Sequence, residues 1–344
     1  MYNYQFFVSR LRYFRAILPY ITIRKLFNLI ISAVCYFFNL KRASSVPPVW
    51  IIILTYRCNY QCIMCQKSSL DDNPYKKPKS MDFVLLEEIL RENHKDIFLV
   101  QLLGGEPMYY DRFTDVLKLL KELKIAYCIT TNGSLLNAEI AEQVAGNCSW
   151  ISFSLDAADP DLYRSIRKGG SIYAIARNII NLNNAKERKK TCLPLLNASA
   201  TMFTYNLYDL RNLLNFCFEH SIRSLSISGG KLYNTKLVGK EHLLRNVKEE
   251  AIEIIENARR NAEALGITLR IALRSLYGNP TERKTPRKRT YNTRLDLFYE
   301  VTVQPDFTVV SAGDDYKCMG TLKREGISEI WNGHEYKVAR DCNP

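Results

Sequence analysis

Cysteine and histidine are scarce in this sequence, which has ten cysteines and four histidines in 344 residues. The cysteines are too sparse for a disulfide scaffold, and no secretory cleavage pattern is present, so we predict reduced thiols in a cytoplasmic protein. The apolar run at residues 26–40 is too short to span a membrane comfortably and contains three polar residues. With 47% hydrophobic and 24% charged residues, the composition excludes a disordered chain, a collagen and a polytopic membrane protein.

Acidic residues are absent from the first 46 positions, which hold seven basic residues. A second basic stretch, residues 281–294, holds six basic residues and a single acidic one. These two stretches account for nearly all of the net charge of +13, so the rest of the chain is close to neutral. Because the basic charge is local, it is weak support for nucleic-acid binding, and we expect no nucleic-acid partner.

The N-terminal segment, residues 1–46, interleaves its arginines with Tyr, Phe, Leu and Ile. This mixture favours a helix lying at the surface of an anionic membrane, on the inner face of the cell membrane. Helices packed on the body of the protein or on a dimer surface, and a true membrane span, stay open as alternatives. A signal peptide is disfavoured because Lys41 and Arg42 directly follow the apolar run. Pro47 and Pro48 then end the N-terminal segment.

Short β-rich runs alternate with helical periodicity from Trp50 onward. Six such units in a row predict an α/β fold over residues 47–235, a partial (β/α)6 barrel similar to a TIM barrel. Chemistry in such folds takes place at the C-terminal ends of the strands. The predicted strands are residues 50–56, 97–103, 125–131, 150–155, 195–203 and 224–228. The predicted helices include residues 83–93, 113–123, 138–145, 172–186 and 208–220.

Three cysteines follow the first predicted strand in a C-x3-C-x2-C pattern, namely Cys58, Cys62 and Cys65. Three thiolates on one loop can bind three irons of a [4Fe–4S] cluster and leave the fourth iron open. A structural zinc site would need a fourth nearby ligand, whereas the next cysteine is Cys128 and the nearest histidine is His94, each in a different unit. The spacing favours an iron–sulfur cluster, with zinc and chance as the alternatives.

The later strand ends carry further motifs in order. The second strand ends in Gly104-Gly105-Glu106-Pro107, the third in Thr131-Asn132-Gly133 and the fourth in Ser154-Leu155-Asp156. Each motif alone is weak, because Gly-Gly before an acid and Asn-Gly are common turn sequences. In this order, after the cysteine loop, they resemble the radical S-adenosylmethionine (SAM) superfamily over about residues 50–228.

The resemblance implies two cofactors: a [4Fe–4S] cluster held by Cys58, Cys62 and Cys65, and a SAM molecule that chelates the open iron. Gly104 and Gly105 would let the backbone approach SAM because they lack Cβ atoms. Further implied roles are a bond from the SAM ammonium to Glu106, adenine packing by Met64, where relatives usually have an aromatic residue, and pairing of Arg167 with the SAM carboxylate. The full set of implied SAM contacts is Met64, Gly104, Gly105, Glu106, Pro107, Thr131, Asn132, Ser154, Asp156 and Arg167.

The chemistry implied by the resemblance belongs to the cofactors. An electron from a donor such as flavodoxin or ferredoxin would cleave SAM reductively to a 5′-deoxyadenosyl radical, which takes hydrogen from an unactivated carbon. The lack of a Ser-His-Asp or paired-carboxylate constellation is consistent with such an enzyme. The cysteines outside the loop at positions 35, 128, 148, 192 and 217 lie in apolar runs, and we predict that they are buried.

Residues 236–344 are predicted to form a long helix at 241–265 and a small α+β domain with a hairpin and a last helix. This end resembles the SPASM or twitch extension, which commonly holds an auxiliary iron–sulfur cluster. The present copy departs from that pattern, because Phe307 replaces the usual hairpin glycine and only Cys318 and Cys342 remain. Either the extension is degenerate, which we favour, or the given sequence stops short of further cysteines. Two thiolates are too few for a second cubane, so we predict a single cluster in this chain.

The sequence favours some substrate classes over others. The N-terminal segment is too short for an added peptide-recognition domain, so we expect a small-molecule, glycan or lipid-linked substrate. The second hypothesis is a maturase that modifies a ribosomally synthesised peptide (RiPP). An RNA-modifying enzyme rests only on residues 281–294, and a non-catalytic membrane-attached pseudoenzyme is disfavoured by the intact cysteine loop and Glu106.

Overall fold

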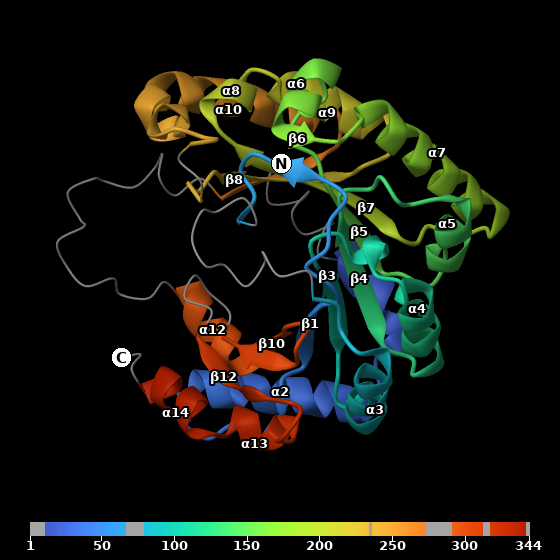
Figure 1. Cartoon of the computed structure of the whole chain (residues 1–344), viewed down its shortest axis with the longest axis vertical. Coiled ribbons are helices and arrows are strands. Elements are labelled where there is room, and N and C mark those ends of the chain that lie inside the picture. Colours follow the sequence, from blue (N-terminus) through green and yellow to red (C-terminus); the bar gives the residue numbers. More distant parts are fainter. Residues whose placement is uncertain (1–10, 67–78, 234–235, 273–290, 312–316, 342–344) are drawn as a thin grey trace. The chain divides into compact units, whose positions relative to one another are not determined.

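The computed structural model describes five stretches of the chain, residues 11–66, 79–233, 236–272, 291–311 and 317–341. Most of the basic stretch 281–294 and Cys342 lie outside the described residues. The described residues form two compact units, each assembled from segments far apart in the sequence (Figure 1). The first unit draws on residues 1–16, 58–78 and 129–279, and the second on residues 17–57, 79–128 and 280–344. These units divide the chain elsewhere than the predicted bounds near 47 and 236, which stay a prediction.

The first unit is built on four parallel strands with helices along one face (Figure 1). Their order is β5 (Trp150–Ser154), β7 (Leu195–Met202), β8 (Ser224–Gly229) and β9 (Thr268–Ala272). Alternate residues point to opposite faces of a sheet, and one face here carries buried apolar side chains such as Ile151 and Phe153. The helices are α5 (Ala138–Val144), α6 (Pro160–Ile166), α7 (Ile172–Arg188), α8 (Thr204–Leu207), α9 (Leu210–Glu219) and α10 (Lys248–Ala264).

Polar capping residues set where the helices of the first unit begin. The side chain of Asn137 accepts a hydrogen bond from the Ile140 amide at 2.9 Å, which satisfies an otherwise unpaired donor in the first turn of α5. Asp159 does the same for α6 through the amides of Asp161 and Leu162. These caps fix the starts of α5 and α6.

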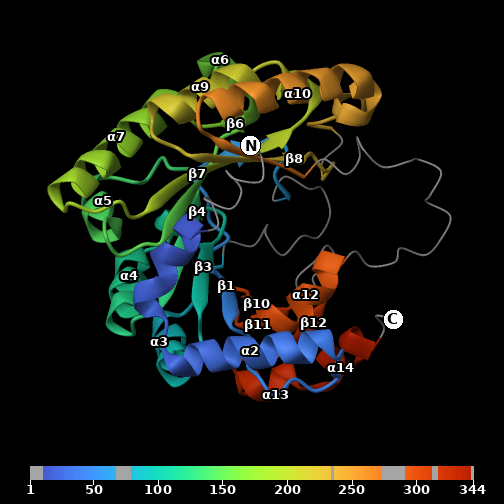
Figure 2. The same cartoon turned by 180° about the vertical axis from the view of Figure 1, so that it is seen from behind.

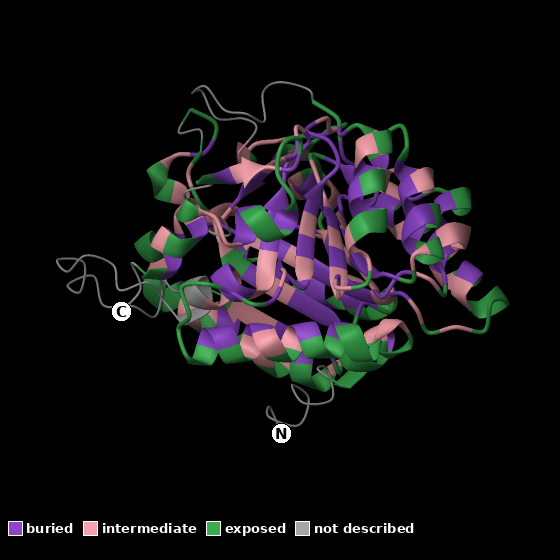
Figure 3. Ribbon diagram, turned by 90° about the horizontal axis from the view of Figure 1, so that it is seen from below, coloured by how far each residue is buried: buried purple, intermediate pink, exposed green. Residues whose placement is uncertain are grey.

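The second unit has the first strand at its centre. β1 (Val49–Ile53) pairs in parallel with β3 (Leu99–Leu103) and with β10 (Glu300–Val303). The antiparallel strands β11 (Thr308–Val310) and β12 (Cys318–Thr321) continue the sheet beyond β10. In Figure 3 the strands are mostly buried and the helices carry the exposed positions. The helices are α2 (Ile23–Phe37), α3 (Phe83–Asn93), α4 (Phe113–Glu122), α12 (Tyr291–Tyr299), α13 (Ile327–Trp331) and α14 (His334–Asp341).

Helix α2 packs on the second unit with its polar side inward. Lys25 Nζ donates to the carbonyl of Lys124 at 2.9 Å, and Asn28 Nδ2 donates to the carbonyls of Val46 and Asp96. Figure 2 shows α2 running along this unit beside α13 and α14. The outward side is apolar, and its exposed large residues are Ile23, Leu26, Phe27, Ile30, Val34 and Phe37. Among the helices that the structure describes, none is long and apolar enough to cross a membrane.

Most predicted elements are present. The six predicted strands correspond to β1, β3, β4 (Ala126–Thr131), β5, β7 and β8, and the predicted hairpin is β10–β11. The predicted helix at 241–265 is shorter, because two 3-10 helices, Lys240–His242 and Leu244–Val247, precede α10. The prediction that Cys192 is buried is wrong. It lies in the connection between α7 and β7, where its side chain is exposed.

The hairpin turn at Phe307 has a backbone conformation that favours glycine. Phe307 has φ +67°, in the left-handed region that side chains other than glycine rarely adopt. Its ring is 1% exposed, and its carbonyl accepts a hydrogen bond from the Leu322 amide at 3.0 Å. Burial of the aromatic ring offsets the conformational cost.

The pH dependence of stability tests the burial of Glu300 at the start of β10. Burial, followed by the charge of Asp296, raises the Glu300 pKa from 4.5 to about 7. The folded state therefore keeps a proton that the unfolded state loses, and stability falls as pH rises from about 4.5 to 7. We expect Glu300→Gln to raise the free energy of unfolding by about 2–3 kcal/mol at pH 8 and to change it little near pH 4.5. Urea titrations at both pH values measure this, and an equal gain at both would contradict it.

Candidate functional site

The cysteine loop of the first unit is tied down by a short antiparallel ladder. β2 (Gln61–Cys62) pairs with β6 (Arg167–Lys168), so Cys62 lies opposite Arg167. The Ile63 amide donates to the Ile166 carbonyl at 3.0 Å, which extends this contact by one residue. Cys58 and Cys62 are half-buried and Cys65 is exposed. These pairings therefore fix the backbone of the loop around Cys62.

A buried ion pair lies behind the loop. Arg167 Nε is 2.7 Å from Asp156 Oδ2, and the two side chains are 11% and 0% exposed. Asp156 Oδ1 also accepts a hydrogen bond from the Thr201 amide at 2.7 Å, and Arg167 Nη1 lies 3.8 Å from Cys62 Sγ. Burial alone would lower the pKa of Arg167. Asp156 and Cys62 raise this pKa by more than burial lowers it, so the guanidinium stays charged.

The Thr131-Asn132-Gly133 motif contacts the same loop through side-chain amides. Asn132 Nδ2 donates to Asn59 Oδ1 at 3.0 Å, and Asn59 Nδ2 donates to Ser134 Oγ at 2.8 Å. Gly133 has φ +78°, and an added Cβ would lie 2.9 Å from the Phe153 ring, so both backbone and space require glycine here. Asn132 thus contacts Asn59, which lies between Cys58 and Cys62 in the loop.

The Gly-Gly-Glu-Pro motif lies in the second unit, against the backbone that leads to Cys58. The Gly105 amide donates to the Thr55 carbonyl at 2.8 Å, and the Glu106 amide donates to the Arg57 carbonyl at 2.9 Å. An added Cβ would lie 2.7 Å from the Thr55 oxygen at Gly104 and 2.4 Å from the Arg57 oxygen at Gly105. These glycines therefore allow the close approach of the segment that follows β1, whereas the sequence suggested only close approach to a ligand.

Glu106 is fully buried and caps a short helix. Its side chain accepts a hydrogen bond from the Met108 amide at 3.1 Å, and Pro107 occupies the first position of the 3-10 helix η4 (Pro107–Tyr109). A carboxylate in this setting keeps acceptor capacity for another donor, because each of its oxygens can accept two hydrogen bonds. The geometry is compatible with the implied bond to a SAM ammonium group.

The remaining predicted contacts lie at strand or loop ends. Ser154 ends β5 and is half-buried, Thr131 ends β4 and is buried, and Met64 is half-buried within the cysteine loop. Asn59 and Thr201 are contacts that the sequence did not single out. Asn59 could have been suspected because it stands inside the cysteine motif, whereas no local signal marks Thr201.

The donor set of the loop fits an iron–sulfur cluster. Cys58, Cys62 and Cys65 form no disulfide and lie within one eight-residue segment after β1. Within the described stretches, no three His, Cys, Asp or Glu side chains lie close enough to hold a single metal ion. Burial raises the pKa of Cys62 to about 12, although the charge of Arg167 opposes this shift. A guanidinium beside a ligand thiolate would balance part of the negative charge of a bound cluster.

Comparison with known proteins gives the class of the domain. Residues 52–199 match the family described as the radical SAM superfamily. A probable GTP 3′,8-cyclase of Methanocaldococcus jannaschii is 26% identical over 170 residues, which cover 48% of this chain and 53% of that protein. The mycofactocin maturase MftC of Mycobacterium ulcerans is 28% identical over 130 residues, which cover 38% of this chain and 34% of that protein. The chain thus spans about half or less of the length of these relatives.

Solved structures share the fold over more of the chain. SuiB of Streptococcus suis bound to S-adenosylmethionine has 18% identity and a TM-score of 0.64, covering 86% of this chain and 68% of that one. The anSMEcpe structure with bound AdoMet has 16% identity and a TM-score of 0.63, covering 85% and 83%. These similarities confirm the partial barrel. The chain carries a radical SAM domain, whose superfamily uses a [4Fe–4S] cluster and SAM.

Replacing Glu106 with glutamine tests its role toward SAM. Gln can still accept the bond from the Met108 amide, so the fold should persist, but the charge that pairs with an ammonium is lost. We expect SAM affinity of the reconstituted protein to fall by about 1.5–3 kcal/mol, measured by equilibrium dialysis. Asp82→Asn is a matched control, because Asp82 caps α3 through the Leu85 amide. Equal SAM affinity in wild type and Glu106→Gln would contradict the assignment.

Proposed function

We propose that this chain is a radical SAM enzyme that cleaves SAM reductively and removes hydrogen from an organic substrate. The observation that carries the proposal is the three-cysteine loop, clamped by β2–β6 onto the buried Arg167–Asp156 pair, within a domain that matches the superfamily. An electron donor such as flavodoxin or ferredoxin would supply the reducing electron.

In this proposal the cysteines, Arg167 and Asp156 have separate roles. Cys58, Cys62 and Cys65 would hold the cluster, which with SAM supplies a radical able to break an unactivated C–H bond. Arg167 would place positive charge beside Cys62, and Asp156 would hold Arg167 in that position. SAM would contact Glu106 and the ends of β4 and β5.

For the substrate we propose a small molecule, a glycan or a lipid-linked compound. Curated relatives include GTP 3′,8-cyclases, which is consistent with a small-molecule substrate. A peptide is the runner-up, because the MftC relative is a maturase and a SuiB structure of similar fold holds a precursor peptide.

Iron analysis tests the cluster and its number together. We expect reconstituted wild type to bind about four iron and four sulfide per chain and to release 5′-deoxyadenosine with dithionite and SAM. The Cys58→Ala/Cys62→Ala/Cys65→Ala variant should lose both, because the loop then has no ligand. Cys318→Ala, which removes the exposed thiol of β12, should keep the full iron content. About four irons left in the triple variant would reveal a second cluster and overturn the single-cluster prediction.

We further propose that the enzyme works at an anionic membrane surface, which its helix α2 contacts. The outward side of α2 exposes Ile23 by 90%, Phe27 by 63% and Phe37 by 76%. These residues cannot turn inward, because the opposite side is held by the hydrogen bonds of Lys25 and Asn28. An exposed apolar strip of this size indicates a surface that contacts another apolar phase.

The charge around this helix favours a lipid surface over a neutral partner. Arg42 is exposed just beyond α2, and Arg24 and Lys41 form exposed ion pairs with Asp96 and Asp341. Such exposed pairs are weak and can exchange the carboxylate for a lipid phosphate. Lys25 is unavailable for this contact because it is buried.

Point substitutions on α2 test the membrane contact better than removal of residues 1–46, which would also strip packed contacts. We expect Phe27→Ser/Phe37→Ser to reduce binding to phosphatidylglycerol vesicles at least about tenfold, because two aromatic rings no longer enter the lipid. Tyr173→Ser, which removes a ring that is 70% exposed on α7, is the control.

Vesicle flotation at low and high salt gives the readout. Wild type should float with anionic vesicles at low salt and less at high salt. Equal flotation of wild type and the double variant would contradict the proposal. A wild-type dimer that the double variant converts to monomer, with no vesicle binding by either, would support the dimer-surface alternative.

A further inference from the structure

One face of the first unit's sheet is polar along its whole width. Paired strands place Ser154 beside Ser199, Ser199 beside Ser226, and Ser226 beside Arg270. The row below it contains Ser152, Asn197, Ser224 and Thr268 in the same strand order. Successive side chains of a strand point to opposite faces, so the serines share one face. The opposite face of the same strands carries the apolar core. A packed core would use apolar residues at these positions.

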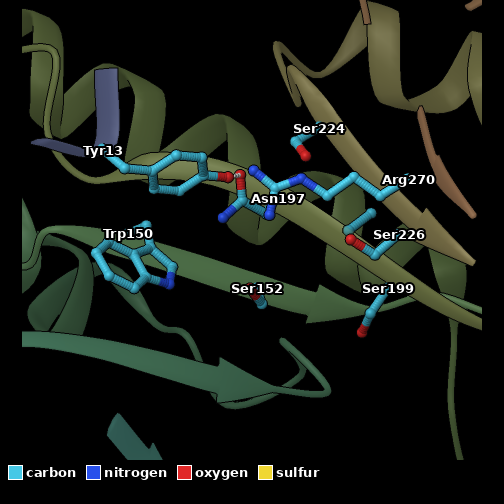
Figure 4. Close-up of a pocket in the computed structure, with 9 residues that line it drawn as sticks. Tyr13, Trp150, Ser152, Asn197, Ser199, Ser224, Ser226 and Arg270 are labelled. Carbon is cyan, nitrogen blue, oxygen red and sulfur yellow. Dashed lines mark hydrogen bonds between the residues drawn. The ribbon is translucent and has the colours of Figure 1, made fainter. Parts of the chain in front are cut away.

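A cavity of about 270 Å³ lies on this polar face (Figure 4). Tyr13 closes one side of it: its hydroxyl donates to Asn197 Oδ1 at 2.7 Å, and its ring meets Trp150 edge-on at 5.3 Å. The guanidinium of Arg270 lies over the same ring, 5.3 Å from the centroid. The cavity therefore offers hydroxyls, an amide and one oriented cation, enclosed by two aromatic rings.

A second cavity, of about 130 Å³, shares Tyr13, Asn197 and Ser224 with the first. Its lining adds Arg12, Lys186 and Arg223. Among the described residues, the linings of the two cavities together hold four basic side chains and no acidic one. This one-sided charge of the described lining favours a negatively charged ligand, since a cluster of basic side chains attracts anions.

We propose that this face binds a hydroxyl-bearing small molecule with an anionic group, and that Arg270 pairs with the anion. A guanidinium presents parallel donors that match the oxygens of a phosphate or a carboxylate. The serine row would bind the hydroxyls and would lead the ligand toward Ser154. Neighbouring strands are about 4.8 Å apart, so the row from Ser154 to Arg270 spans roughly 14 Å, the length of a small molecule of one or two rings.

The proposal deepens the proposed function, because it names the substrate class of the same domain. Ser154 is both an implied SAM contact and the first member of the row that ends at Arg270. An anchor at Arg270 would therefore hold one end of the substrate and leave the other end near the SAM contacts. The enclosing Tyr13 comes from the N-terminal segment, which thereby helps to form the site.

Equilibrium binding of simple probes to the full-length reconstituted protein tests this proposal. Glucose 6-phosphate, glucuronate and glucose differ in the anionic group while keeping the sugar, and Trp150 fluorescence reports occupancy of the cavity. We expect saturable binding of at least one charged probe, and at least about tenfold weaker binding or none for glucose. Binding of the phosphate but not of glucuronate identifies a phosphorylated ligand, and the reverse identifies a carboxylate.

Variants of Arg270 make the result specific. Arg270→Gln should weaken the charged probe at least about tenfold, and Arg270→Lys should recover part of that loss because it keeps the charge. Arg177→Gln, on the exposed side of α7, should bind like wild type. Trp150→Phe should abolish the fluorescence change without abolishing binding in calorimetry. Each variant is first checked for an unchanged thermal midpoint.

Three outcomes would overturn the proposal: no saturable binding of any probe, equal binding of glucose and the charged sugars, or unchanged binding in Arg270→Gln. The first would mark the serine row as a solvated sheet face. Binding is read without reductant, whereas the proposed function is read as 5′-deoxyadenosine in wild type. A failure of one measurement is therefore distinguishable from a failure of the other.

Discussion

The buried contact between Arg167 and Asp156 is the interaction on which the candidate site depends. A guanidinium and a carboxylate that are nearly excluded from water are stable only if each remains paired, because an unpaired buried charge costs several kcal/mol. Arg167 lies opposite Cys62 in the β2–β6 ladder, and Asp156 is bonded to the Thr201 amide of β7. The pair thus connects the cysteine loop to the parallel sheet, and it places positive charge where three thiolates would gather.

Backbone proximity is the second constraint, and it acts in the second unit. Gly104 and Gly105 admit the carbonyls of Thr55 and Arg57 so closely that any Cβ would clash. This contact sets the path of the chain just before it enters the cysteine loop. It also places Glu106 in a fully buried position with its carboxylate fixed by the Met108 amide. The Gly104-Gly105-Glu106-Pro107 motif, which resembles a ligand-binding loop in the sequence, therefore also packs against the backbone of residues 55–57.

The proposed membrane surface and the proposed substrate face have the same physical origin. In the first case a helix exposes apolar side chains to the outside. In the second case a sheet places polar side chains around a cavity. Helix α2 buries Lys25 and Asn28 and exposes phenylalanines, whereas the sheet of the first unit lines a cavity with serines. Such arrangements cost stability when nothing contacts them, and a lipid or a ligand would recover part of that cost.

The sequence by itself determined the strand and helix order, the class of domain and the cysteine loop, because these depend on local periodicity and on spacing within short motifs. It placed the motifs at successive strand ends, since parallel strands bring their C-terminal ends together, but it did not predict the contact between Asn132 and Asn59. Only the tertiary structure decided which side of α2 faces the protein. The apolar side of an amphipathic helix normally faces the core, whereas the packed side of α2 holds Lys25 and Asn28. The pairing of Arg167 with Asp156, the crowding at Gly105 and the serine row ending at Arg270 were likewise decided by tertiary structure, since each joins residues from separate elements whose strand register no local pattern encodes.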